Sequence, residues 1–203
     1  MADELPPASL VDTLGPVLGN GQVTVRTLLE AFGDRAFGLF LTLLNLPSVF
    51  FAPPALAAVS VVPTALLGGQ MVLGRTQPWL PAALLDRAVS PEPLRRVLAR
   101  AGPWLARLEA LGRPRLPWAA GGMALRVFGL FAILAALIVL LPVPGTNVLP
   151  ALSLVVMTVA FARRDGLLFL AGIVVAIAGA LVALLAAGIA VEAVRYLWAW
   201  LRH

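Results

Sequence analysis

The distribution of charge divides the chain into three uncharged apolar stretches and the arginine-rich segments that flank them. The stretches cover residues 36–74, 127–162 and 166–191. Each is longer than the ~20 residues with which an α-helix crosses a hydrocarbon core of ~30 Å. Hydrophobic residues make up 61% of the chain, whereas soluble domains contain roughly 45–50%. The pattern predicts an all-α integral membrane protein with a single membrane domain over residues 1–203.

The same apolar unit occurs twice along the chain. Phe-Gly-Leu-Phe stands at 37–40 and again at 128–131, and Pro53 and Pro144 each follow 16 residues after the first Phe of their copy. A duplicated hydrophobic unit with prolines at its middle is typical of transporters. The duplication predicts three segments: repeat one (22–81), a basic linker (82–121) and repeat two (122–191).

Prolines break both copies into shorter helices. A straight helix cannot carry the Pro53–Pro54 pair without losing backbone hydrogen bonds, so the first stretch is expected to form two legs that bend near Pro53. Pro47 and Pro63 are expected to interrupt it as well.

In the second copy the predicted legs are 127–141 and 147–162, which reach roughly 22 and 24 Å at 1.5 Å per residue. Because both legs are shorter than the ~30 Å core, we expect re-entrant hairpins rather than full spans.

The linker is dense in arginine. By the positive-inside rule it is cytoplasmic, in a multi-pass protein of the bacterial cytoplasmic (inner) membrane. Ser90 is expected to cap a helix that begins at Pro91, and apolar residues from Leu94 to Leu111 recur at spacings of three and four. This amphipathic helix is expected to lie in the membrane interface, or alternatively to pack against the membrane domain.

Two further helices follow from local signals. Thr24 is expected to cap a short helix that stops at Gly33. The third apolar stretch contains no proline and predicts a clean C-terminal transmembrane helix. Small residues recur every fourth position in it, at 172, 176 and 180 and at 179, 183 and 187. These faces favour close helix packing and a homodimer.

Several motifs resemble the ExoD family of exopolysaccharide-synthesis proteins. They are Leu-Pro-Val-Pro-Gly-x-Asn-x-Leu-Pro at 141–150, Arg-x-Asp-Gly at 163–166 and Pro-Trp-Leu-Pro at 78–81. The resemblance covers nearly the whole chain from about residue 22. It implies an inner-membrane protein linked to exopolysaccharide production, with polysaccharide-synthesis proteins as possible partners.

One candidate site lies at the proline breaks. Asn147 is expected to cap the second leg of repeat two, whose free N–H groups would form an anion site at membrane depth. Gly145 would let the backbone turn and approach a ligand. The alternative is a self-satisfied tip without a ligand. The predicted binding residues at the two breaks are Pro142, Pro144, Gly145 and Asn147, with Pro53 and Pro54.

A second candidate site is formed by arginines at the ends of the apolar stretches. Their guanidinium groups suit phosphate, which they bind bidentately. The alternative role is topology determination with contacts to lipid headgroups. The residues expected to ring the cytoplasmic mouths are Arg35, Arg75, Arg126, Arg163, Arg164 and Asp165.

The sequence also disfavours several classes of function. The apolar stretches hold no Asp, Glu, His, Lys or Arg, which argues against a proton pump; their polar side chains include Asn45, Gln70, Ser48, Ser60 and Thr64. There is no cysteine, and the one histidine is His203, so no enzyme, metal site or cofactor is expected. Nucleic acid is not an expected partner.

The function expected from these features is transport or flipping of an anionic lipid, with polyprenyl phosphate as the plausible carrier. The alternatives are a non-transporting accessory or scaffold protein of polysaccharide synthesis, and a small-ion transporter.

Overall fold

The computed structural model describes residues 23–49, 54–116, 118, 121–140 and 145–202. Their fold is all-α apart from one short pair of strands. In chain order the elements are β1 (Val23–Thr24), α2 (Val25–Phe32), the 3-10 helix η1 (Gly33–Arg35), α3 (Ala36–Val49), α4 (Pro54–Val72), α5 (Ala82–Leu85), β2 (Ala88–Val89), α6 (Pro91–Leu111), α7 (Gly122–Val139), α8 (Val148–Arg163) and α9 (Gly166–Leu201).

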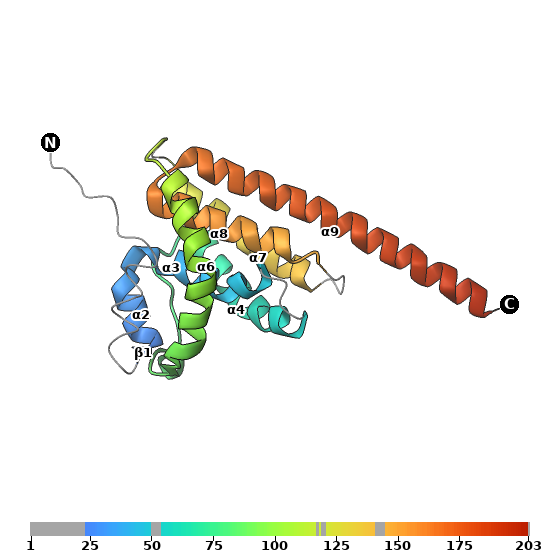
Figure 1. The fold of residues 1–203 in the computed structure, drawn as a ribbon, viewed down its shortest axis with the longest axis horizontal. Helices are drawn as coiled ribbons and strands as arrows, with labels where there is room; N and C mark the ends of the chain where they lie inside the picture. Colours follow the sequence, from blue (N-terminus) through green and yellow to red (C-terminus); the bar gives the residue numbers. More distant parts are fainter. Residues whose placement is uncertain (1–22, 50–53, 117, 119–120, 141–144, 203) are drawn as a thin grey trace.

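Two helical hairpins form the core of the protein. The first consists of α3 and α4, the second of α7 and α8, and the hairpins are packed crosswise, with α4 chiefly against α7 and α3 against α8 (Figure 1). Phe37, Phe128 and Phe169 are fully buried where the hairpins and α9 meet. The two-legged shape predicted for the first apolar stretch is confirmed, because α3 ends at Val49 and α4 begins at Pro54.

Some predicted helix boundaries were wrong. Pro47 and Pro63 do not interrupt the first hairpin, since they lie inside α3 and α4. Proline is tolerated inside such helices where neighbouring helices and polar side chains compensate the freed backbone groups. Helix α7 begins at Gly122 rather than at 127, so it includes Arg126.

The two Phe-Gly-Leu-Phe motifs mark the close crossings between the hairpins. Gly38 in α3 lies against Thr158 in α8, where a Cβ would come within 2.6 Å of the Thr158 methyl carbon. Gly129 in α7 lies against Gly68 in α4, where a Cβ would come within 2.5 Å of the Gly68 carbonyl oxygen. Each motif therefore brings the first helix of one hairpin against the second helix of the other.

Helix α9 follows α8 and then continues past the bundle (Figure 1). Its 36 residues correspond to about 54 Å. Gly172 and Gly179 face α8, against Met157 and Pro150 respectively. At these two glycines, the predicted small-residue faces therefore pack against another helix of the same chain. Beyond Gly188 the helix is exposed, including the side chains of Tyr196, Trp198 and Trp200.

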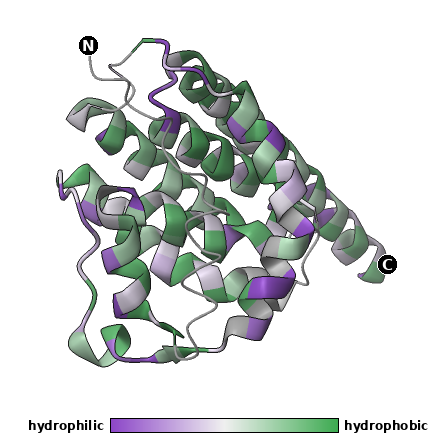
Figure 2. Ribbon diagram, turned by 60° about the vertical axis from the view of Figure 1, so that its left-hand side comes forward, coloured by the Kyte–Doolittle hydropathy of each residue, from purple (hydrophilic) through white to green (hydrophobic). Residues whose placement is uncertain are grey.

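Among the described residues, two helices are long and apolar enough to cross a membrane, Gly122–Val139 and Gly166–Leu201. Three other apolar helices are shorter: Ala36–Val49, Ala58–Val72 and Val148–Arg163. Figure 2 shows that the long helix ending at the C-terminus is mainly hydrophobic along its length. This pattern indicates association with a membrane.

Helix α6 crosses the bundle with one face packed on it (Figure 1). Leu105 is buried against Leu46 of α3 and Val155 of α8. Packing against the bundle, the alternative that the sequence left open, is therefore present, and the interfacial location remains a prediction. The helix begins at Pro91 as expected, but the side chain of Ser90 makes no capping hydrogen bond.

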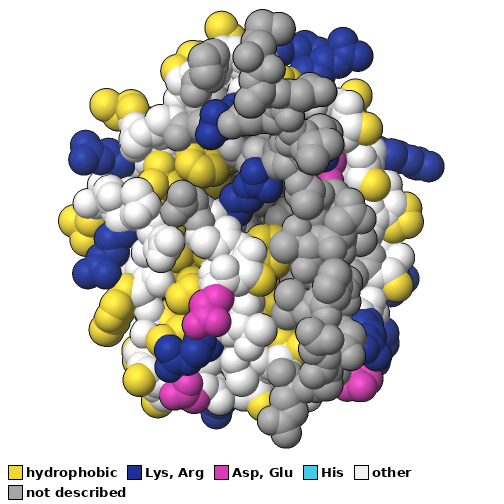
Figure 3. Space-filling model, turned by 90° about the vertical axis from the view of Figure 1, so that its left-hand side faces the viewer, with side chains coloured by type: hydrophobic (Ala, Val, Ile, Leu, Met, Phe, Trp, Pro, Cys, Tyr) yellow, Lys and Arg dark blue, Asp and Glu magenta, His cyan; other side chains and the backbone are white. Residues whose placement is uncertain are grey.

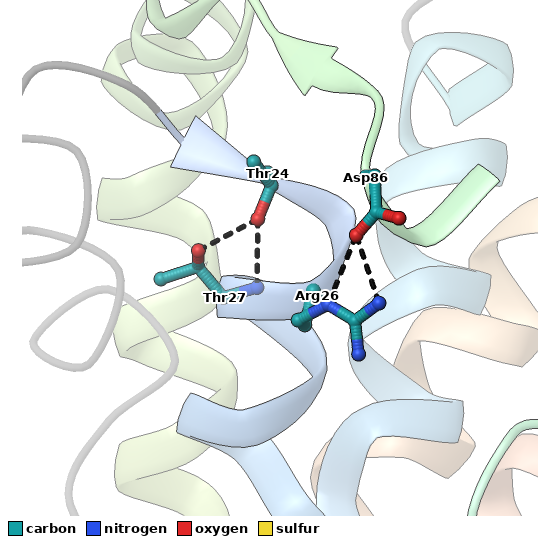
Figure 4. Close-up of polar contacts among 4 residues, drawn as sticks. All are labelled: Thr24, Arg26, Thr27 and Asp86. Atoms are coloured by element: carbon teal, nitrogen blue, oxygen red, sulfur yellow. Dashed lines mark hydrogen bonds and ion pairs between the residues drawn. The ribbon is translucent and has the colours of Figure 1, made fainter. Parts of the chain in front are cut away.

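The segment before α3 is held by short polar contacts (Figure 4). As predicted, Thr24 caps α2: its hydroxyl accepts a hydrogen bond from the Thr27 N–H at 3.1 Å, and α2 ends before Gly33. The guanidinium of Arg26 donates twice to one carboxylate oxygen of Asp86, at 3.1 and 2.8 Å. The ion pair therefore links α2 to the end of α5.

Candidate functional site: an arginine-lined cavity at the open ends of the hairpins

The open ends of both hairpins meet at one end of the bundle and enclose a cavity of about 340 Å³. The end of η1, the segment after α4, the start of α7 and the end of α8 each contribute to its wall. Its lining consists of Arg35, Thr76, Gly121, Gly122, Leu125, Phe161, Ala162 and Arg164.

Arg35 is the more enclosed of the two cavity arginines. It is half-buried at the end of η1. Its pKa is lowered, first because burial removes water from the guanidinium and then because Arg163 and Arg164 repel its charge, while Glu109 acts in the opposite direction. A bound anion would replace the lost water and offset this repulsion.

Arg164 is held in an unusual backbone conformation. Its φ of 53° and ψ of 38° lie in the left-handed region, at the C-terminal end of α8. Glycine is the usual residue there, because a side chain in this region costs roughly 1–2 kcal/mol. The chain instead has an arginine at this position, and that arginine lines the cavity.

The third element of the site is the N-terminus of α7. Gly121 is the N-cap of this helix, and Gly122 is its first residue. Because glycine has no side chain, no side-chain group caps the helix N-terminus. The first N–H groups of a helix lack partners within the helix and carry the positive end of its dipole. Together with Arg35 and Arg164, they make the cavity suited to a phosphate or carboxylate.

Among the side chains that the structure describes, no acidic one lines the cavity. Figure 3 views the molecule from the side of α2 and shows arginine side chains at several places around this face, with fewer acidic side chains among them. Within the described part of the chain, no ion pair involves the side chain of Arg35 or of Arg164.

Two of the predicted mouth residues help to build the wall of the cavity rather than line it. The guanidinium of Arg163 pairs with the buried carboxylate of Glu109 at 3.3 Å, which fastens α6 to α8. Asp165 is buried and caps α9 by accepting from the N–H groups of Leu167 and Leu168. Its other oxygen accepts from the Arg113 N–H at 2.8 Å.

The remaining predicted arginines lie outside the cavity. Arg75 and Arg126 are both exposed and do not line it. The guanidinium of Arg126 lies against Gly74, whose Cβ would come within 3.3 Å of a guanidinium nitrogen.

At the hairpin tips, the predicted cap is wrong. Asn147 precedes α8 but makes no side-chain capping hydrogen bond. Its φ of −79° and ψ of −19° are helical, whereas a capping residue needs an extended backbone to reach back to the helix N–H groups. Gly145 does adopt the positive φ expected of a turn glycine, at 85°. Pro54 begins α4, while Pro53, Pro142 and Pro144 lie outside the described residues.

Sequence reasoning named Arg35 and Arg164 and missed the six other described residues of the lining, which include Thr76, Gly121 and Gly122. The available signal was the Gly-Gly pair a few residues before the second apolar stretch, because glycine is accepted at the N-cap of a helix. Only the fold brings this helix start beside Arg35.

Comparison with known proteins shows the family to which this sequence belongs. The family model described as "Exopolysaccharide synthesis, ExoD" matches residues 9–185. Protein ExoD of Rhizobium meliloti is 30% identical over 174 residues, covering 81% of this chain and 71% of the relative. An uncharacterised protein of Synechocystis sp. is 28% identical over 176 residues, covering 86% of this chain and 81% of the relative. No solved structure matches the chain. The resemblance noted in the sequence motifs is thereby confirmed, and the chain belongs to the ExoD family of exopolysaccharide-synthesis proteins.

Proposed function

We propose that this protein binds the phosphate of a lipid carrier in the arginine-lined cavity and moves that lipid across the cytoplasmic membrane. The observation that carries the proposal is the convergence of Arg35, Arg164 and the N-terminus of α7 on one cavity. All three favour an anion with several oxygen acceptors, and guanidinium groups favour phosphate in particular.

The family narrows the choice of anion. Its description links the chain to exopolysaccharide synthesis, and polyprenyl phosphate is a lipid carrier that such synthesis depends on. A phosphate on a long apolar chain suits a cavity that opens beside membrane helices. The proposed cargo is therefore polyprenyl phosphate, with the arginine-rich linker and the cavity on the cytoplasmic side.

The dimensions of the second hairpin support a re-entrant arrangement. The start of α8, at Leu149 and Pro150, packs against Gly179 of α9. Gly179 lies 13 residues after Gly166, or about 20 Å along the helix axis. If the arginine end lies at the membrane surface, the hairpin tip falls short of the far side of a ~30 Å core. We propose that both hairpins enter and leave on the cytoplasmic side as parts of a repeat.

A binding experiment tests the first step. Purified protein in lipid nanodiscs should retain polyprenyl phosphate in native mass spectrometry, and Arg35→Gln and Arg164→Gln should each reduce the bound fraction about tenfold. Arg126→Gln is the matched control, because Arg126 is an exposed arginine that does not line the cavity. Equal binding by all four proteins would refute the cavity as the site.

A flipping assay tests the second step. Reconstituted liposomes carrying a labelled polyprenyl phosphate should show faster movement between leaflets with the wild-type protein than with Arg35→Gln. Binding without any acceleration of movement would leave phosphate recognition intact and refute transport.

The exposed end of α9 favours a second candidate, an accessory protein of the polysaccharide-synthesis machinery. Its side chains beyond Gly188 include large apolar and aromatic groups that contact little of the described chain. Such a helix suits a membrane partner. Loss of a co-purifying synthesis protein in Leu197→Asp, with the cavity variants unaffected, would favour this function over transport.

A further inference from the structure

The first hairpin buries a set of polar side chains in its two helices, called the ladder below, and Asn45 of α3 bonds to Thr64 of α4 within it. Each of them is at most 5% exposed. They lie in apolar helices, where a polar group without a partner is costly. The members are Thr42, Asn45 and Ser48 on α3, with Ser60 and Thr64 on α4.

The contacts of the ladder occupy its amide donors and leave oxygen acceptors. The Asn45 side-chain NH₂ donates to the Leu41 carbonyl at 2.9 Å and to the Thr64 hydroxyl oxygen at 3.0 Å. Both amide hydrogens are thus used, so any further contact of this side chain has to be made by its carbonyl oxygen as an acceptor. The Thr42 hydroxyl is buried and has no hydrogen-bond partner within the described residues.

The second hairpin buries Ser153 and Thr158 on α8, but it has no polar side chain at the positions that match the ladder. When the Phe-Gly-Leu-Phe motifs are aligned, the five ladder positions correspond to residues 91 positions later in α7 and α8. All five of these residues are apolar, so a proline-broken hairpin packs without the ladder. The corresponding residues are Ile133, Ala136, Val139, Ala151 and Val155.

Two prolines add oxygen acceptors to the same helices. Pro47 in α3 and Pro63 in α4 lack an N–H, so each removes the helical donor of the carbonyl four residues earlier, at Leu43 and Val59. In membrane transporters, such freed carbonyls serve as ligands for Na⁺. The first hairpin therefore combines hydroxyl, amide and freed carbonyl oxygens with no charged side chain in either helix.

We propose that the first hairpin binds a dehydrated alkali cation, for which Na⁺ is the probe. Neutral oxygens suit a monovalent cation. Divalent cations prefer carboxylates, and anions need donors of the kind found in the arginine-lined cavity. The bound ion would be the partner that the buried Thr42 hydroxyl oxygen lacks. This site is separate from that cavity, and the proposal does not rest on phosphate binding.

Thermal unfolding of the full chain in nanodiscs tests the site. At constant ionic strength, exchanging choline chloride for NaCl at about ten times the dissociation constant should raise Tm by about 3–6 °C. In Thr42→Val, the Tm in choline chloride should rise, because an unpartnered buried hydroxyl becomes a methyl group. The rise in Tm caused by Na⁺ should fall to a small fraction of its wild-type value. A purely structural role for Thr42 predicts the higher Tm with an unchanged Na⁺ shift.

Further variants make the outcome decisive. Ser48→Ala should also weaken the Na⁺ shift. Ser153→Ala should keep it, because the Ser153 hydroxyl is a buried group on α8 that donates to its own helix at Pro150. Arg35→Gln should keep the full Na⁺ shift although it weakens phosphate binding. A shift with KCl as well as NaCl would support an alkali-cation site without selectivity. A shift with neither salt, or a full Na⁺ shift in Thr42→Val, would overturn the proposal.

Discussion

Gly129 of α7 lies so close to Gly68 of α4 that a Cβ on Gly129 would come within 2.5 Å of the Gly68 carbonyl oxygen. Gly38 of α3 lies equally close to α8, where a Cβ on Gly38 would come within 2.6 Å of the Thr158 methyl carbon. These two crossings set the distance between the hairpins. They also set the positions of the helix ends that enclose the arginine-lined cavity.

Substitution at the first crossing should therefore destabilise the protein. In Gly129→Ala the added methyl group meets a backbone carbonyl that cannot rotate away, so we expect a loss of about 1–3 kcal/mol in the free energy of unfolding. Gly69→Ala is the control in the partner helix. Nothing lies within 4 Å of its added Cβ, and alanine is favoured over glycine inside a helix by roughly 0.5–1 kcal/mol. Thermal unfolding in nanodiscs should give shifts of opposite sign, and equal shifts would contradict the crossing.

Arg164 allows stability and binding to be separated. Arg164→Gly should raise the free energy of unfolding by roughly 1 kcal/mol, because glycine adopts the left-handed conformation without a side-chain clash. The same change removes a cavity charge, so binding of inorganic phosphate or a lipid phosphate should weaken about tenfold. Calorimetric titration alongside thermal unfolding measures both effects. Arg164→Gln should weaken binding similarly without the gain in stability.

The ion pair between Glu109 and Arg163 should also affect stability and binding in opposite directions. Glu109→Gln removes a buried charge partner of Arg163, which should cost roughly 1–3 kcal/mol of stability. The carboxylate also favours the charged form of Arg35 from nearby. Its loss leaves the region more positive, and we expect tighter anion binding. Weaker anion binding in this variant would mean that Glu109 acts on the shape of the cavity rather than on its charge.

The local features of the fold were largely predictable from sequence. The capping threonine before α2 and the double proline between α3 and α4 act within a few residues, and both predictions are confirmed. Pro47 and Pro63 were misjudged because whether a helix tolerates proline depends on what packs around it. Asn147 was misjudged because the capping rule needs an extended backbone, and residue type alone does not reveal the backbone angles.

The site was predictable in its residue types and not in its arrangement. Guanidinium chemistry selected Arg35, Arg163 and Arg164 together. Only the tertiary fold shows that Arg163 is paired with Glu109, while the other two face the cavity. The partners Glu109 and Arg163, and likewise the cavity residues Arg35 and Arg164, lie more than 50 positions apart in the chain. A single sequence contains no information on the distance between such residues.

The absence of cysteine from the chain makes single-cysteine labelling a clean test of the re-entrant arrangement. Three exposed positions sample three depths: Met123 at the arginine end of α7, Leu140 just after the other end of α7, and Val194 near the C-terminus of α9. In oriented membranes, a charged maleimide should label Met123→Cys only from the cytoplasmic side and Val194→Cys only from the outer side. Leu140→Cys should react slowly from both sides, because a re-entrant tip stops within the hydrocarbon core. Rapid labelling of Leu140→Cys from the outer side, at the rate of Val194→Cys, would mean that α7 crosses the membrane completely.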